Sequence, residues 1–216
     1  MIKAVIFDMD GVVAKTILPH LNAWQYIFWH KFKIRLTKKY FFKYLNARQG
    51  PDIIAMVTGQ NIPYVERVKI TQEKDKYGRK LLQNIKPTTG LIDFLKFLKK
   101  NKIKIGLATS AQEDMKKFLL QKLKIKKYFQ AIVTAKEIKH GKPHPDCYLR
   151  AARKLKVKPS AAIVIEDAPL GIQAAKAGKF FKVVGITTSQ PAKDLKQADL
   201  IIRNFLDSRL YCQIGE

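Results

Sequence analysis

Residues 3–12 read KAVIFDMDGV, an apolar run of strand length that ends in Asp8 and Asp10 and continues with Gly11. In an open α/β sheet, ligands bind beyond the carboxyl ends of the strands, where this run delivers its two carboxylates. Residues i and i+2 lie on the same side of an extended chain, so both acids can face one ligand. In such a pair, one carboxylate can act as the nucleophile and the other can transfer protons, while a divalent cation neutralises their negative charge. Two solvated acids in a turn would show the same short pattern.

The composition indicates a globular protein. The chain has 216 residues, of which 47% are hydrophobic, enough for one sizeable domain or a core with an insertion. No apolar run approaches the roughly 20 residues of a spanning helix, and the start lacks a signal-peptide pattern. Cys147 and Cys212 are too few for a disulfide framework. We therefore expect a monomer in the reduced cytoplasm that makes no contact with a membrane.

The chain is strongly basic, with a formal net charge of +25. Its lysines are spread along the whole length, without a single basic arm or a recognisable nucleic-acid motif. We interpret them as the solvated faces of helices and expect no nucleic-acid partner. The charge would still help to recruit anionic substrates, a class that includes phosphate esters.

Residues 15–85 hold no convincing buried strand, and their apolar residues recur at helical spacing. Trp24, Ile27 and Phe28, for example, share one helical face. We interpret the dense aromatic residues of segment 24–44 as the core of a helical unit.

Two breaks divide this helical segment. Gly50-Pro51 and residues 59–63 (GQNIP) indicate interruptions between helices. We predict a small helical insertion over 15–85, placed between residues 1–14 and 86–216 of an α/β core.

From residue 87 onward, strands and helices alternate. This alternation predicts a parallel sheet with right-handed crossovers, an α/β Rossmann-like core. Expected helices cover 91–100, 113–122, 146–155 and 170–177, and expected strands cover 104–110, 131–134, 162–165, 183–186 and 200–202.

Three of the apolar strands end in polar, reactive side chains, and a lysine followed by two nearby prolines precedes one helix. If these strands are neighbours, one crevice collects four acids, hydroxyl groups and a lysine. That inventory suits phosphoryl transfer to a carboxylate, and hard oxygen ligands with few histidines favour Mg²⁺ over zinc. The residues concerned are Asp8, Asp10, Thr109, Ser110, Lys142, Glu166 and Asp167.

The chain resembles the haloacid dehalogenase superfamily over nearly its whole length. Within it, the resemblance is to the branch of β-phosphoglucomutase and small sugar-phosphate phosphatases, which carries a helical cap after the first motif. Four ordered motifs match: residues 8–12, Thr109, Lys142 with Pro143, and Glu166 with Asp167. The resemblance implies a core of this family's fold with an inserted α-helical cap.

The resemblance also implies roles for four residues. Asp8 would be the nucleophile that becomes an aspartyl-phosphate. Asp10 would protonate the leaving oxygen and then activate water or an acceptor hydroxyl. Thr109 would hydrogen-bond the phosphoryl group, and Lys142 would neutralise its charge and steady Asp8.

The implied cofactor is Mg²⁺. The ion would be bound by Asp8, Asp167 and the main-chain carbonyl of Asp10. Glu166 would either bind the ion directly or contact one of its ligands. Gly11 would permit close approach of the backbone to the phosphate.

Ser110, His20 and Arg48 complete the expected substrate contacts. His20 is either a hydrogen-bonded histidine of the cap interior or a substrate or hinge residue. Arg48 is either a solvated residue at a helix end or a grip for a second phosphate. Asn46 stands where the cap signature of this branch has glycine.

The expected function is hydrolysis of a small phosphorylated metabolite by a Mg²⁺-dependent phosphatase, with sugar phosphates as the expected class. A phosphomutase of the β-phosphoglucomutase type is the first alternative. A noncatalytic basic binding protein is the alternative from another class. The sequence leaves the physiological substrate open.

Overall fold

The computed structural model describes residues 1–215, which fold around a six-stranded parallel sheet with strand order β3-β2-β1-β4-β5-β6. Ala4 of β1 lies beside Lys104 of β2 on one side and Ala162 of β4 on the other. The direction of the strand order therefore reverses at β1, where α/β sheets bind their ligands. The strands are β1 (Ala4–Phe7), β2 (Lys104–Ala108), β3 (Ala131–Val133), β4 (Ala162–Glu166), β5 (Lys182–Ile186) and β6 (Leu200–Ile202).

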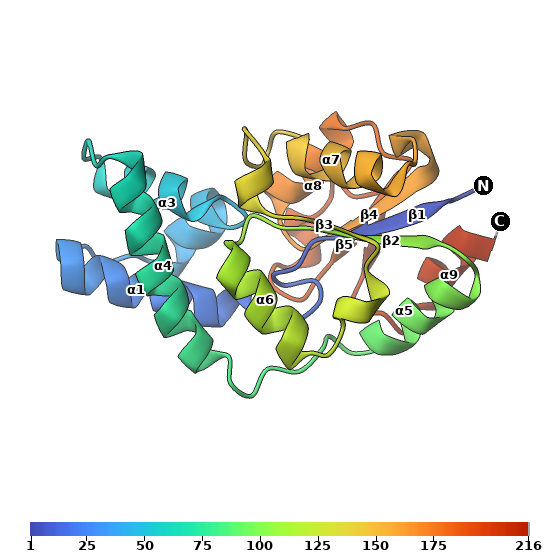
Figure 1. Cartoon of the computed structure of the whole chain (residues 1–216), viewed down its shortest axis with the longest axis horizontal. Helices are drawn as coiled ribbons and strands as arrows, with labels where there is room; N and C mark the ends of the chain where they lie inside the picture. The colour runs from blue at the N-terminus through green and yellow to red at the C-terminus, as the bar shows by residue number, and fades with distance from the viewer. Residues whose placement is uncertain (216) are drawn as a thin grey trace.

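Helices cover both faces of the sheet (Figure 1), which confirms the predicted α/β class. Val5 and Phe7 of β1 belong to the hydrophobic cluster under the first group of helices, whereas Ala4 and Ile6 belong to the cluster under the second. This alternation follows from the two-residue period of a strand that is buried on both faces. The first group is α5 (Leu91–Lys100), α6 (Glu113–Lys122) and α9 (Ser208–Gly215), and the second is α7 (Asp146–Leu155) and α8 (Pro169–Ala177).

The remaining helices lie at the carboxyl-end side of the sheet, at the left of Figure 1. They bury a third hydrophobic cluster of their own, built around Trp24, Phe28 and Leu45. A separate core is consistent with the predicted insertion, whose limits at residues 15 and 85 stay a prediction. These elements are α1 (Ile17–Phe32), α2 (Lys38–Tyr40), a π-helical turn (Phe41–Leu45), α3 (Gly50–Thr58) and α4 (Tyr64–Leu81).

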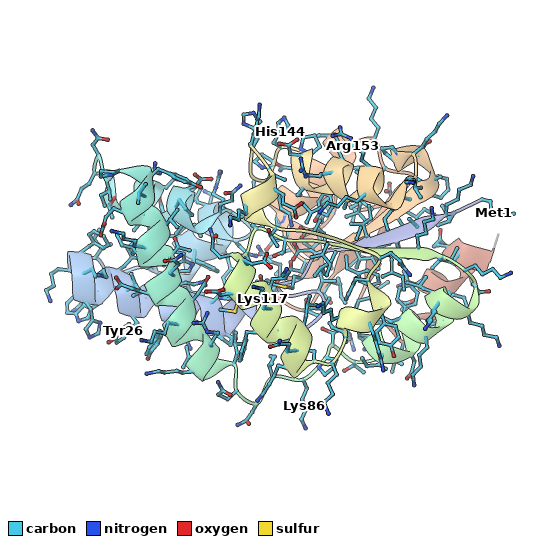
Figure 2. All side chains as sticks on the ribbon, in the orientation of Figure 1. Met1, Tyr26, Lys86, Lys117, His144 and Arg153 are labelled. Atoms are coloured by element: carbon cyan, nitrogen blue, oxygen red, sulfur yellow. The ribbon has the colours of Figure 1, made fainter. Side chains whose placement is uncertain are left out.

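The structure corrects two details of the helical segment. Gly50-Pro51 lies in the first turn of α3 rather than between helices, because proline is tolerated where the backbone N–H has no partner. The aromatic residues are only partly core: Trp24 and Phe28 are buried, whereas Trp29 remains 44% exposed. Tyr26, labelled on the outer side of α1 in Figure 2, is also exposed. Helix α9 was not expected from the sequence.

Short 3₁₀ turns link several elements, at Lys126–Tyr128, Ala135–Glu137, Pro159–Ala161 and Ala192–Asp194. Among residues 1–215, none of the helices combines the length and the apolar character needed to span a membrane.

Candidate active site

The carboxyl ends of β1, β2 and β4 bring the predicted polar residues to one cavity. Asp8 follows β1, Thr109 follows β2, and Asp167 follows β4. Because β1 lies between β2 and β4, these side chains meet above the middle of the sheet. They line a cavity of about 80 Å³ with Asp10 and Lys142. Residues of the helical segment, among them His20 and Asn46, line its other side.

Lys142 is the centre of the charge network. Its Nζ is 2.5 Å from Asp8 Oδ1 and also contacts Glu166 Oε1, with the side chain almost fully buried. Burial lowers the pKa of this amine, but the charges of Asp8 and Glu166 outweigh burial and hold the pKa well above its usual value. The ammonium group therefore remains charged beside the Asp8 carboxylate.

Glu166 is fully occupied by protein donors. Its Oε1 accepts hydrogen bonds from Lys142 and from the Tyr148 hydroxyl at 2.6 Å. Its Oε2 accepts from the backbone N–H groups of Asp167 at 2.8 Å and Ala168 at 3.0 Å. Such a carboxylate is fixed in place, and it positions the Lys142 amine.

Asp8, Glu166 and Asp167 form a buried group whose oxygens lie within 4.8 Å of one another. Burial, together with the neighbouring carboxylates, raises the pKa of Asp8 and of Asp167 well above the usual value, although Lys142 opposes the rise. Clustered acids of this kind are stabilised by a cation, and hard carboxylate oxygens suit Mg²⁺. The residues therefore fit the predicted metal. Since Glu166 is held by other donors, Asp8 and Asp167 are the carboxylates left for it.

Two glycines leave space for these acids. Gly11 has a φ of +80°, and a Cβ there would lie 2.0 Å from Asp167 Oδ2. In α8, a Cβ on Gly171 would lie 1.7 Å from Glu166 Oε1. The close approach at Gly11 is thus to Asp167, and whether Gly11 also contacts a phosphate stays a prediction.

The side chain of Asp10 is held in place by residues of the helical segment. Its Oδ1 accepts hydrogen bonds from Thr16 Oγ1 at 2.7 Å and is 2.9 Å from His20 Nε2. Burial raises the pKa of Asp10, but the interaction with His20, the hydrogen bond from Thr16 and the charge of Lys74 lower the pKa overall. The carboxylate form is therefore favoured in this arrangement.

His20 is buried and bonded on both ring nitrogens, since Lys74 Nζ lies 3.1 Å from Nδ1. An ammonium group can only donate, so Nδ1 accepts and Nε2 carries the proton toward Asp10. Lys74 is also 2.6 Å from Asp75 Oδ1, in a buried ion pair. His20 therefore connects Asp10 of the core with the Lys74–Asp75 ion pair of the helical segment.

The remaining predicted residues lie at the junction of core and helical segment. Ser110 Oγ donates to the carbonyl of Ala47 at 2.9 Å, so the hydroxyl proton is used in a hydrogen bond within the protein. Arg48 lines the cavity, with its Nε bonded to the carbonyl of Tyr44 at 2.7 Å. Thr109 is buried, and its Oγ1 accepts from the backbone N–H of Ala111 at 3.0 Å.

Sequence reasoning missed several residues that form hydrogen bonds with the site. Thr188 donates to the carbonyl of Gly11, and Ser189 donates to the carboxylate of Asp167. The polar run after β5 repeats the pattern of the other strand ends and could have identified them. Tyr148 and Lys74 gave no comparable signal. His144, on the outer edge of the molecule in Figure 2, is an exposed loop residue.

Comparison with known proteins gives consistent matches. A family model described as haloacid dehalogenase-like hydrolase matches residues 5–186. A β-phosphoglucomutase of Bacillus subtilis (strain 168) is 34% identical over 220 residues, covering 96% of this chain and 92% of that protein. A fructose-1-phosphate phosphatase of Escherichia coli (strain K12) is 30% identical over 175 residues, covering 80% and 90%. The crystal structure of a β-phosphoglucomutase from Clostridium difficile has a TM-score of 0.87 at 29% identity, covering 99% of this chain and 97% of that one.

Proposed function

This chain belongs to the haloacid dehalogenase-like hydrolase family, and on that premise we propose that it is a Mg²⁺-dependent phosphatase of small phosphorylated metabolites, chiefly sugar phosphates. The observation that carries the proposal is the contact of the Lys142 ammonium with Asp8 Oδ1, beside the carboxylate of Asp167. This arrangement offers a nucleophile, a fixed positive charge and a cation site within one buried cavity. Relatives that are named phosphatases and a phosphomutase support the same class.

In the first half-reaction, a carboxylate oxygen of Asp8 attacks phosphorus and the ester P–O bond breaks. Lys142 offsets the negative charge of the phosphoryl oxygens, and Glu166 keeps the amine in place. Asp10 gives the proton that it took up from water in the preceding cycle to the leaving oxygen, which departs as an alcohol. Asp8 then carries the phosphoryl group as an acyl phosphate.

In the second half-reaction, Asp10 acts as a base. Its lowered pKa favours the carboxylate, which accepts a proton from the attacking water. The bond between Asp8 and phosphorus breaks, inorganic phosphate leaves, and Asp10 is protonated for the next cycle. When bound, Mg²⁺ would be held by Asp8, Asp167 and the main-chain carbonyl of Asp10, and it would neutralise charge on the phosphoryl oxygens.

We further propose that residues 15–85 act as a cap that excludes bulk water. Ser110 and Gln190 of the core donate to carbonyls of Ala47 and Phe42, so hydrogen bonds attach the segment to the core at two points. A phosphomutase remains the second candidate, because the relative with 34% identity is a β-phosphoglucomutase. A mutase would need a grip for a second phosphate, and Arg48 is the residue we propose for it.

The test is phosphate release from hexose 1- and 6-phosphates, fructose 1-phosphate and p-nitrophenyl phosphate, with Mg²⁺ or with EDTA. We expect Asp8→Asn to lower kcat at least about a thousandfold, because it removes the nucleophile. Asp93→Asn, at an exposed position of α5, is the matched control and should match wild type. Wild-type turnover in Asp8→Asn, or full activity in EDTA, would refute the proposal. Interconversion of hexose phosphates with little release would identify a mutase.

A further inference from the structure

The chain between α2 and α3 has an irregular backbone where it meets the cavity. Phe41–Leu45 forms a π-helical turn, and the N–H of Asn46 donates to the carbonyl of Phe41 at 3.0 Å. The next residue, Ala47, has a φ of +72°, in the left-handed region that costs energy for a residue with a Cβ. Single π-helical turns and residues with strained backbone conformations occur frequently at functional sites.

The side chain aimed here is Asn46. It is only 4% exposed, and it lines the cavity next to Ala47 and Arg48. Among the described residues, two buried side-chain nitrogens have no hydrogen-bond partner, Asn46 Nδ2 and Arg67 Nε. Of the two, only Asn46 belongs to the cavity. A buried N–H without an acceptor is unfavourable, and a ligand bound in the cavity is one group that can supply the acceptor.

We propose that the amide of Asn46 binds a hydroxyl oxygen in the part of the substrate that does not react, and so selects phosphate esters of polyols and sugars. This inference rests on the proposed phosphatase function. The core side of the cavity carries Asp8, Lys142 and Asp167, whereas the cap side carries the neutral Asn46 next to Arg48. A phosphoryl group is matched by the charged donors, whereas a neutral amide suits a hydroxyl.

The experiment compares esters with and without hydroxyl groups. Glycerol 1-phosphate and fructose 1-phosphate carry hydroxyls beside the ester, whereas n-propyl phosphate and p-nitrophenyl phosphate do not. Asn46→Leu keeps the size of the side chain but removes the donor. We expect kcat/KM for the hydroxylated esters to fall about tenfold to a hundredfold, the range of one lost buried hydrogen bond. The two esters without hydroxyls should change by less than about twofold, because nothing they contact is removed.

Two further variants make the result specific. Asn61→Leu, the same substitution at an exposed position of the helical segment, should leave all four substrates unchanged. Asn46→Asp replaces the amide with an acceptor, to which a hydroxyl can donate but a phosphate cannot. This variant should therefore retain more activity on glycerol 1-phosphate than Asn46→Leu does.

Three results separate the hypotheses. If wild type hydrolyses none of the four esters, the proposed function fails and this inference with it. If wild type is active but Asn46→Leu affects both kinds of ester equally, or neither, the inference alone is overturned. If Asn46→Asp abolishes hydrolysis of p-nitrophenyl phosphate, the amide faces the phosphoryl group, which also overturns the inference.

Discussion

Lys142 shows how one buried side chain can organise several acids. Its amine contacts Asp8 and Glu166, while Tyr148 and two backbone N–H groups fix Glu166. Removing one partner of a buried ion pair leaves the other charge unpaired, so these contacts depend strongly on one another. The Asp8 carboxylate is therefore held by residues from distant parts of the chain.

Cys147 lies beside this network and provides a test of its packing. The thiol is 1% exposed, and burial raises its pKa to about 12 although the charge of Lys142 opposes the rise. Only the thiolate reacts with disulfide reagents, so Cys147 should remain unreactive at about pH 8 while exposed Cys212 reacts. A thiol count with Ellman's reagent should give one group in the native protein and two after unfolding. Two rapidly reacting thiols in the native protein would contradict the buried site.

At the scale of elements, strand ends and helix faces determine which residues meet. The acids of β1 and β4 become neighbours because those strands pair directly. The amino-terminal part of α8 passes so close to Glu166 that only glycine fits at position 171. Helix α4 also carries a glycine, Gly78, but a Cβ there would lie 3.5 Å from its nearest neighbour, the Cε of Met115.

The two helical glycines should therefore respond in opposite ways to alanine. Gly78→Ala should raise the free energy of unfolding by about 0.5–1 kcal/mol, because alanine loses less backbone entropy in a helix. Gly171→Ala should lower it by about 1–3 kcal/mol through overpacking, and should reduce phosphatase activity by displacing Glu166 from Lys142. Denaturant unfolding and phosphate-release assays measure both effects. Equal stability changes in the two variants would contradict the described packing.

Much of this architecture could be predicted from the sequence. The limits of α5, α6, α7 and β6 match the predicted ranges, because amphipathic spacing and helix-end residues are local signals. The strand-end acids were also identified, since their pattern lies within a few residues. Contacts between distant residues, such as Lys74 with His20, 54 positions apart, have no local signal. The unpaired amide of Asn46 likewise depends on how the helical segment packs against the core.

At the scale of the whole molecule, the fold separates charge between the two ends of the sheet. The acids gather at the carboxyl ends of the strands, whereas lysines from two segments, 99–104 and 154–156, surround a hollow of about 320 Å³ at the opposite end. The interpretation of the lysines as solvated helix faces therefore does not account for this group, which lines one hollow. That no nucleic acid binds there remains a prediction, which retention on single-stranded DNA at physiological salt would contradict. The hollow is lined by Lys99, Lys102, Lys104, Lys154 and Lys156.

These distant lysines should have little influence on catalysis. A five-residue strand is about 15 Å long, whereas the Debye length at physiological ionic strength is about 8 Å. The triple variant Lys99→Gln, Lys102→Gln, Lys156→Gln should therefore keep kcat/KM for p-nitrophenyl phosphate within about twofold of wild type at ~150 mM salt. A tenfold loss under these conditions would show that the lysine-lined end contributes to substrate capture.

The most direct test of the account is detection of the phosphoryl group on Asp8 during turnover. The enzyme would be mixed with Mg²⁺ and fructose 1-phosphate, quenched in acid within the first turnover, digested and analysed by mass spectrometry. We predict that the peptide containing Asp8 gains the mass of one phosphoryl group, and that Asp8→Asn shows no such gain. Rapid phosphate release without phosphorylated Asp8, or with the phosphoryl group on another residue, would contradict the assignment of Asp8 as the nucleophile.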